Sequence, residues 1–333
     1  MKLFLYLVFI LVSSINIFIK AQPSIRYEDK IRIGEAYRIA ELYGNKIWGN
    51  WHKAPFAMLL VYGDNEFLIN HPFPSDDFKL IGFDSLLNTK VYYRKRVFNA
   101  NLLATFPAVN GLSTIVVGTP ENTGKSSVEW IITILHEHFH QLQYSQPDYY
   151  SSVNTLDLAG EDSSGMWMLN YPFPYEDEKV NNQYKKLTET LLKVVIPFPP
   201  DSRLFSRDLI SYLNERNIFK NLLNEKDYKY FSFQLWQEGI ARYTEYKIAD
   251  MISHYDPSEE LTALIDYKPF YEVADELREN IFNQLKEYQL KDNKRICFYS
   301  YGAAEGLLLD RVNKNWKEQY HKEKFFLEKY YPD

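Results

Sequence analysis

The sequence predicts an α+β fold, in which a strand-rich first half is followed by a mostly helical second half. Two observations support this class. Short apolar runs rich in β-branched residues lie between positions 56 and 118, whereas helical spacing of apolar residues dominates from position 181 onward. With 46% hydrophobic and 25% charged residues, the chain of 333 residues has an ordinary globular composition and enough apolar material for a large core.

The first 21 residues are predicted to be a secretory signal peptide. Lys2 supplies the positive charge, residues 3–19 are nearly all apolar, and Ala21 is a plausible last residue before cleavage. An uncleaved membrane anchor is the alternative, but the apolar run is short for a spanning helix and is interrupted by Ser13 and Asn16. We therefore expect a secreted or periplasmic protein with no stable membrane insertion after cleavage.

Charge and cysteine content argue against two classes of function. Loss of residues 1–21 takes the formal net charge from −6 to −8, because two lysines and no acids are removed. This acidic balance, without any long basic run, argues against a nucleic-acid partner. Cys297 is the only cysteine, so an internal disulfide and a CxxC site are excluded, and we expect it to be buried as a small apolar residue.

The first half contains one predicted helix and four predicted strands. Gly44 and Asn45 follow an apolar pattern of helical spacing and predict the end of the helix. A turn at 63–65 separates two apolar runs and predicts a β-hairpin. The predicted elements are a helix at 31–43 and strands at 56–62, 66–70, 89–97 and 113–118.

A capped helix is predicted to stand at the junction of the two halves. Ser126, with Glu129 three residues later, fits a capping box. Apolar residues that include Leu135 and Phe139 then recur at helical spacing, and the helix is expected to end by Pro147. The face that borders this apolar stripe carries polar residues, so we expect it to form the floor of a cleft.

After this helix the strand signal fades and helices are predicted throughout. Pro-rich breaks such as 197–200 separate some of them. We expect residues 22–333 to form a single domain, with a strand-rich subdomain at 22–145 and a helical subdomain at 146–333. The predicted helices are 181–194, 207–223, 230–252, 271–290 and 301–320.

The most informative residues are the stretch His136-Glu137-His138-Phe139-His140, which has the pattern His-Glu-x-x-His. On a helix, His136 and His140 lie one turn apart on the same face, where two imidazoles can hold one metal ion, usually zinc. Glu137 can reach a water beside that ion, which is the position a general base needs. His138 points away from His136, so we expect it to be a surface or packing residue.

A catalytic zinc needs a third protein ligand, and two glutamates are candidates. Glu161 lies 21 positions beyond His140, in a segment with no helical pattern. Glu238 lies 98 positions beyond His140, within a predicted helix. It is followed by Gly239 and Ala241, whose small side chains allow close approach of two helices. We therefore prefer Glu238 to Glu161.

His-Glu-x-x-His with a downstream glutamate on a second helix resembles the gluzincin metallopeptidases of the zincin superfamily. The resemblance covers the motif helix, the strand before it and the second helix. It implies a zincin-like fold with the active site between the two subdomains, and Zn²⁺ held by His136, His140 and Glu238. It also implies that the strand at 113–118 is the edge strand that holds an extended peptide by backbone pairing.

The residues around the third ligand have further expected roles. Glu245 lies two turns after Glu238 and either holds a ligand histidine in its tautomer from behind or is an exposed helix charge. Arg242 is expected to form a simple ion pair on the helix. The resemblance implies a Tyr or His that stabilises the oxyanion, and Tyr301 is our choice. The other candidates are Tyr243, His254 and Tyr299.

The sequence thus predicts a secreted zinc-dependent peptidase that acts on peptides or proteins, with Glu137 as the base. One alternative is a catalytically inactive, zincin-like metal-binding or interaction protein. Another is a carbohydrate-active enzyme that uses paired carboxylates, for which Glu161 and Asp162 are too common a pattern to provide support. Peptide specificity, endo- or exo-action and oligomeric state are not determined by these patterns.

Overall fold

A computed structural model describes residues 22–196 and 202–332 of the chain. The predicted signal peptide and the Pro-rich break at 197–200 lie outside these described residues. Among the helices of the described part, none is both long enough and apolar enough to cross a membrane.

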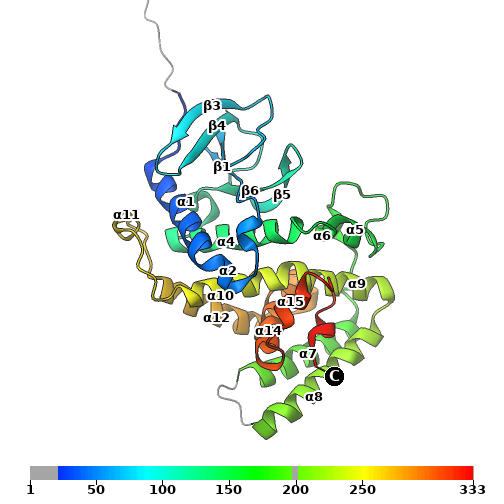
Figure 1. Cartoon of the computed structure of the whole chain (residues 1–333). Helices are drawn as coiled ribbons and strands as arrows, with labels where there is room; N and C mark the ends of the chain where they lie inside the picture. The colour runs from blue at the N-terminus through cyan, green and yellow to red at the C-terminus, as the bar shows by residue number, and fades with distance from the viewer. Residues whose placement is uncertain (1–21, 197–201, 333) are drawn as a thin grey trace, which may run out of the picture.

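A six-stranded mixed sheet forms one end of the molecule, with strand order β3-β4-β2-β1-β6-β5 (Figure 1). Strand β1 pairs in parallel with β6, and every other neighbouring pair is antiparallel. The strands are β1 (Met58–Tyr62), β2 (Asn65–Ile69), β3 (Lys79–Asp84), β4 (Thr89–Lys95), β5 (Leu103–Val109) and β6 (Leu112–Gly118).

The predicted hairpin and the strands at 89–97 and 113–118 are confirmed as β1–β2, β4 and β6. Two strands were not predicted. Strand β3 is largely exposed and contains Gly82 at a positive φ, so it carries no alternating apolar pattern. Strand β5 contains Pro107 and has an irregular register after Phe106, features that normally argue against a strand.

The expectation that the strand at 113–118 is the edge strand is wrong. Strand β6 lies between β1 and β5, and β5 is the edge of the sheet on that side. A proline is tolerated at an edge because its missing N–H need not pair with a neighbouring strand. The unpaired edge that faces away from β6 therefore belongs to β5.

The first helical segment is longer than predicted. Helix α1 (Tyr27–Ile39) continues through a π-helical turn, η1 (Ala40–Gly44), into α2 (Asn45–Ile47). Gly44 has a right-handed φ of −52°, so it does not end the helix. The helical segment instead ends at Trp48, whose backbone is extended.

Helix α4 (Ser127–Tyr144) lies between the sheet and the C-terminal helices (Figure 1). The predicted capping box is confirmed: the Ser126 hydroxyl accepts from the Glu129 N–H, and the Glu129 carboxylate accepts from the Ser126 N–H. Strands β5 and β6 and helix α1 pack against α4 on one side, and α10 (Ile240–Met251) packs on the other. This placement buries nearly every residue of α4.

The second half is helical, as predicted. The predicted helix at 230–252 is confirmed, although it begins at Glu225 and contains a π-helical turn. The predicted helix at 301–320 is two helices with a break after Val312. The longer elements are α7 (Glu178–Val195), α8 (Ser202–Leu222), α9 (Glu225–Gln234), η3 (Leu235–Gly239), α12 (Phe270–Glu287), α14 (Ile296–Val312) and α15 (Trp316–Tyr320). The shorter ones are η2 (Trp51–Lys53), α3 (Pro120–Thr123), α5 (Tyr149–Asn154), α6 (Trp167–Asn170), α11 (Glu259–Thr262), α13 (Leu290–Asn293) and η4 (Leu327–Tyr330).

One apolar core extends from the sheet through α4 into the C-terminal helices. It includes Ile115 of β6, Leu135 of α4, Ile240 of α10 and Phe298 of α14, all fully buried. A smaller cluster covers the other face of the sheet. Cys297 is buried as expected, and its burial raises the pKa of the thiol to about 12.

Candidate metal centre

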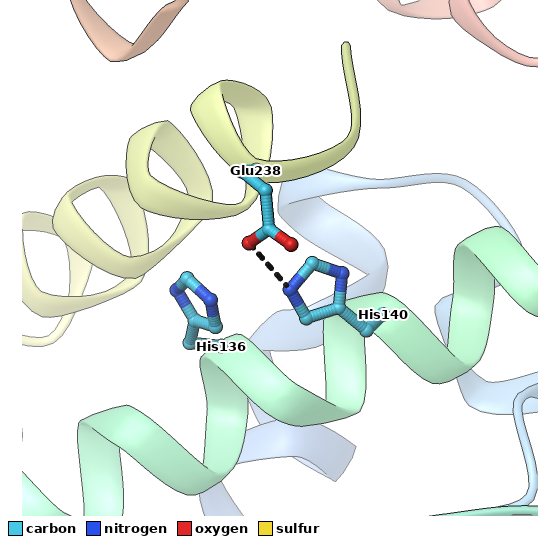
Figure 2. Close-up of side chains that lie close together, drawn as sticks. All are labelled: His136, His140 and Glu238. Carbon is cyan, nitrogen blue, oxygen red and sulfur yellow. Dashed lines mark ion pairs between the residues drawn. The ribbon is translucent and has the colours of Figure 1, made fainter. Parts of the chain in front are cut away.

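Three side chains from two packed helical segments converge on one point. His136 and His140 come from α4, and Glu238 comes from η3. Their candidate ligand atoms all lie within 4.8 Å of one another. Figure 2 shows the Glu238 carboxylate above both rings, with 3.5 Å between its Oε2 atom and Nε2 of His140.

The donor set and its spacing fit a zinc ion. A tetrahedral zinc with bonds of about 2.1 Å needs donor atoms roughly 3.4 Å apart. The pair Nε2 of His140 and Oε2 of Glu238 has this spacing, and the other pairs lie within 4.8 Å, so the ligands would have to draw together around an ion. Two imidazole nitrogens and one carboxylate oxygen are also typical ligands of zinc, whereas hard cations such as Mg²⁺ prefer sites made of oxygen atoms alone.

The π-helical turn and a glycine contact position Glu238. A π-turn inserts a residue into the helical register and often marks a functional site. Gly239 directly follows Glu238, and a Cβ atom there would lie 2.5 Å from Cα of Gly302 on α14. No side chain fits in this contact, so η3 is held against α14 while Glu238 faces α4. The expected close approach at Gly239 is therefore made with α14.

A carboxylate orients His136 from behind. Nδ1 of His136 lies 3.1 Å from Oε2 of Glu245, so the ring donates its Nδ1–H there and presents Nε2 to the centre. Arg242 also contacts this oxygen at 2.8 Å, which confirms the expected ion pair on the helix. Burial opposes the charged form of Glu245, but Arg242 and His136 outweigh it and lower the carboxyl pKa to about 2. Glu245 is thus a buried partner of His136, the first of its two expected roles.

A neutral amide orients His140. Nδ1 of His140 lies 2.7 Å from the side-chain oxygen of Gln143, so Nε2 is again the nitrogen that faces the centre. The Gln143 amide in turn donates to the backbone carbonyls of Trp236 and Gln237, at 3.2 and 3.0 Å. Gln237 donates back to the Gln143 oxygen at 3.0 Å. Sequence reasoning missed Gln143, although its position three residues after His140 places it on the same helix face.

The electrostatics of the metal-free centre favour the protonated, positively charged form of His140. Burial disfavours the charged ring, but the carboxylates of Glu238 and Glu137 outweigh this and raise the pKa of His140 to about 9. Burial likewise opposes ionisation of Glu238, yet the charges of His140 and His136 lower its pKa to about 2. Nε2 of His140 therefore carries a proton that faces the Glu238 carboxylate and that a metal ion would displace.

Glu137 lies where the motif helix meets the edge strand. Its carboxylate is 2.8 Å from the hydroxyl of Thr105, which is the third residue of β5. The same hydroxyl is 3.0 Å from the Glu137 carbonyl. The Glu137 carboxylate also contributes to the raised pKa of His140, which lies three residues later on the same helix. The base candidate is thus held between the metal centre and the open edge of the sheet.

Several residues considered from the sequence lie away from this cluster. Glu161 is in an exposed turn, and His254 is in another. The Tyr243 hydroxyl donates to Asp310. Tyr301, our choice for oxyanion stabilisation, is fully buried, with its hydroxyl 2.7 Å from that of Tyr212. The structure therefore does not bring these four residues to His136 and His140.

Two other tyrosines interact with the charge of Glu238, and the ring of one of them, Tyr144, lies 6.4 Å from that of His140. Tyr299 is close enough to Glu238 that burial, together with the Glu238 charge, raises the pKa of its phenol far above the ordinary value. Tyr144, one turn after His140, shows a pKa raised by burial and by the charges of Glu238 and Glu137. Tyr299 was among the candidates, and Tyr144 was missed although it shares a helix face with His140.

His138 is a packing residue, one of the two roles expected for it. Its ring stacks on Phe56 with 3.8 Å between ring centroids, and also on Trp51 at 5.5 Å. Burial lowers the pKa of His138 to about 4, so the ring is neutral at physiological pH. The opposite face of α4 is thereby fixed against the η2 region and the start of β1.

Comparison with models of protein families, with curated proteins and with solved structures finds no match to this chain.

Proposed function

We propose that this chain is an exported zinc-dependent peptidase of the gluzincin type, with a zincin-like arrangement of its catalytic elements. The observation that supports this is the convergence of His136, His140 and Glu238 within 4.8 Å. Glu238 is 98 positions from His140 in the sequence, so its place beside the two histidines is a product of the fold and not of local sequence. Glu137 lies beside this group, with a side chain that can accept a proton.

The proposed reaction uses the chain's own groups around the ion. A zinc ion held by His136, His140 and Glu238 would supply Lewis-acid polarisation of the scissile carbonyl and of water. Glu137 takes a proton from the attacking water as the bond from water oxygen to carbonyl carbon forms. It then delivers that proton to the amine nitrogen as the C–N bond breaks. Glu245 and Gln143 keep both imidazoles in the tautomer with a free Nε2.

Tyrosine hydroxyls are the proposed donors to the oxyanion. The phenol pKa values of Tyr299 and Tyr144 are raised, so both hydroxyls keep their protons at neutral pH and can donate. A donor aimed at developing negative charge in a water-poor site stabilises the transition state more than it does the ground state. Tyr299 comes from the helical half and Tyr144 from α4, so the two approach the centre from different elements.

The open edge of β5 is the proposed binding strand for an extended peptide. An edge strand offers unpaired N–H and C=O groups, and a peptide can add to it as a further strand. Thr105 lies in the middle of this strand and contacts the Glu137 carboxylate. A peptide bound along β5 would thus lie alongside the base. Pro107 cannot donate, so pairing is expected before this residue and not through it.

The test combines metal content with cleavage. The purified chain is assayed for bound zinc and for cleavage of casein and a peptide library, with and without a chelator. We expect about one zinc per chain and chelator-sensitive cleavage. The Glu137→Gln variant should keep zinc and fold while losing about 10²–10⁴-fold in kcat. Absence of bound zinc would overturn the proposal, and bound zinc without any cleavage would favour a metal-binding interaction protein.

A further inference from the structure

A guanidinium without a carboxylate partner lies at the edge of the metal centre. Arg295 is the residue that precedes α14, and its Nη1 donates to the Tyr299 hydroxyl at 2.7 Å. The guanidinium carbon lies 5.7 Å from the centroid of the Tyr299 ring. Among the residues that the structure describes, no carboxylate forms an ion pair with Arg295. The side chain is only partly exposed, so its charge is only partly solvated.

The packing of α14 places this group beside the third ligand. The carbonyl oxygen of Phe298 would lie 3.1 Å from a Cβ atom on Gly239, so the first turn of α14 lies against the π-turn that carries Glu238. Tyr299 directly follows Phe298, and Arg295 is one turn earlier. In agreement with this placement, the positive charge of Arg295 contributes to the low pKa of Glu238.

The charges around the centre favour the binding of an anion beside Arg295. Glu245 is paired with Arg242, and Glu238 would be neutralised by a divalent ion together with the histidines. Tyr299 and Tyr230, which interact with Arg295, carry no charge at neutral pH, and the carboxylate that interacts with it is that of the third ligand, Glu238. A half-buried guanidinium that faces only hydroxyls and a metal centre is best satisfied by a bidentate carboxylate.

We infer that Arg295 binds a carboxylate of the substrate, so that the enzyme prefers peptides that carry such a group close to the scissile bond. This inference rests on the proposed peptidase function and adds a substrate class to it. The carboxylate has two sources: the free C-terminus of the peptide, which would make the enzyme a carboxypeptidase, and an Asp or Glu side chain. Both sources present the same planar anion to the guanidinium, and the experiment distinguishes the C-terminal carboxylate from the side-chain carboxylate.

The chain offers a matched control for Arg295. Arg278 of α12 also lies over an aromatic ring four residues later, with 5.8 Å from its guanidinium carbon to the Phe282 centroid. Arg278 is exposed, and unlike Arg295 it is not among the main charges that lower the pKa of Glu238. The variants are Arg295→Met, Arg295→Lys and Arg278→Met, each checked for zinc content and thermal unfolding. Peptides come in matched sets, with a free or amidated C-terminus and with Glu or Gln beside the cleavage site.

The test consists of two measurements, one of enzyme kinetics and one of peptide binding. In the active enzyme, Arg295→Met should raise KM by about 10- to 100-fold for a carboxylate peptide, with a smaller change in kcat and in the KM of its uncharged counterpart. Arg295→Lys should recover only part of the loss because it lacks the fork geometry. In the zinc-loaded Glu137→Gln variant, calorimetric titration should show that the carboxylate peptide binds more tightly than the uncharged one, and that Arg295→Met abolishes the difference.

The outcomes separate this inference from the proposed function. A preference for the free C-terminus over the amide identifies the carboxypeptidase source, and a preference for Glu over Gln identifies the side-chain source. Cleavage or binding with neither preference overturns the inference and leaves the peptidase proposal standing. An equal loss of kcat for charged and uncharged peptides also overturns it, because Arg295 would then act on the oxyanion. Failure of every peptide to bind or to be cleaved counts against both.

Discussion

The Oε2 atom of Glu245 lies 3.1 Å from Nδ1 of His136 and 2.8 Å from Nη1 of Arg242, so one buried carboxylate oxygen joins a candidate metal ligand to a cation. His140 has no such charged partner, and its Nδ1 meets the neutral amide of Gln143. One histidine of the motif is thus supported by a charged group and the other by a neutral one. Substitutions of Glu245 and of Gln143 should therefore have different effects on zinc binding and on stability.

Glu245→Gln should weaken zinc binding by about 10- to 100-fold. The amide can still accept from Nδ1 of His136, but it lacks the negative charge that makes the imidazole a stronger ligand. The measurement is a competition titration of zinc against a chromophoric chelator. Glu279→Gln, an exposed position on α12, is the matched control and should change nothing. Equal zinc affinity in both variants would show that Glu245 has no role in binding.

Gln143→Leu should lower the free energy of unfolding by about 2–3 kcal/mol. The change leaves the carbonyls of Trp236 and Gln237 and Nδ1 of His140 without this partner in a buried site. Urea unfolding of the metal-free protein measures the effect without interference from zinc. Gln146→Leu, which removes one partly exposed bond to Leu142, should cost less than about 1 kcal/mol. A loss in Gln143→Leu no larger than in this control would contradict the argument.

Glu238→Ala should reduce zinc retention far more than Glu161→Ala. The first variant removes one of three ligands, whereas the second removes a carboxylate in an exposed turn. Metal content after dialysis against a weak chelator distinguishes them, and circular dichroism verifies that both variants fold. Retention that fell only in Glu161→Ala would transfer the ligand role to that residue.

Zinc affinity should increase with pH up to about 9. Because the pKa of His140 is raised to about 9, the metal-free protein holds a proton there at neutral pH that zinc must displace. The protonated ring stabilises the metal-free fold fully below its unfolded pKa of about 6.5, and this contribution is lost as pH rises through about 9. Glu238 has the opposite dependence, with a contribution lost as pH falls toward about 2.

Calorimetric titration with zinc at pH 7.5, in buffers with different ionisation enthalpies, measures the protons released. We expect about one per zinc bound. No release at pH 7.5 would mean that His140 is already neutral in the metal-free protein.

Much of the fold could be predicted from local patterns, and what was missed has identifiable physical causes. The hairpin, the capping box and the helical second half depend on alternation, helical spacing and turn residues within a few positions. Strand β5 could not be recognised, because Pro107 removes the local signal and only its neighbour β6 makes the segment a strand. The order of strands in the sheet depends on long-range pairing, which is why β6 was wrongly expected at the edge.

The same difference between local and long-range signals applies to the residues of the site. Glu238 was found because it stands before a glycine in a helical segment, a local signal. The choice of Tyr301 over Tyr299 depended on helix orientation, which two positions change by about 200°. Long-range packing fixes that orientation, including the contact between Gly302 and Gly239, and leaves Tyr299 beside Glu238 and Tyr301 against Tyr212.

The contact between Gly239 and Gly302 also limits how the molecule can open. Because no side chain separates them, η3 and the first turns of α14 pack backbone to backbone, and we expect them to move together with Glu238, Tyr299 and Arg295. Any widening of the space around His136 and His140 has to occur between α4 and these two segments. Such a movement would draw the Glu238 carboxylate away from both imidazoles. The same movement that admits a bulky substrate would therefore also weaken the hold on the metal.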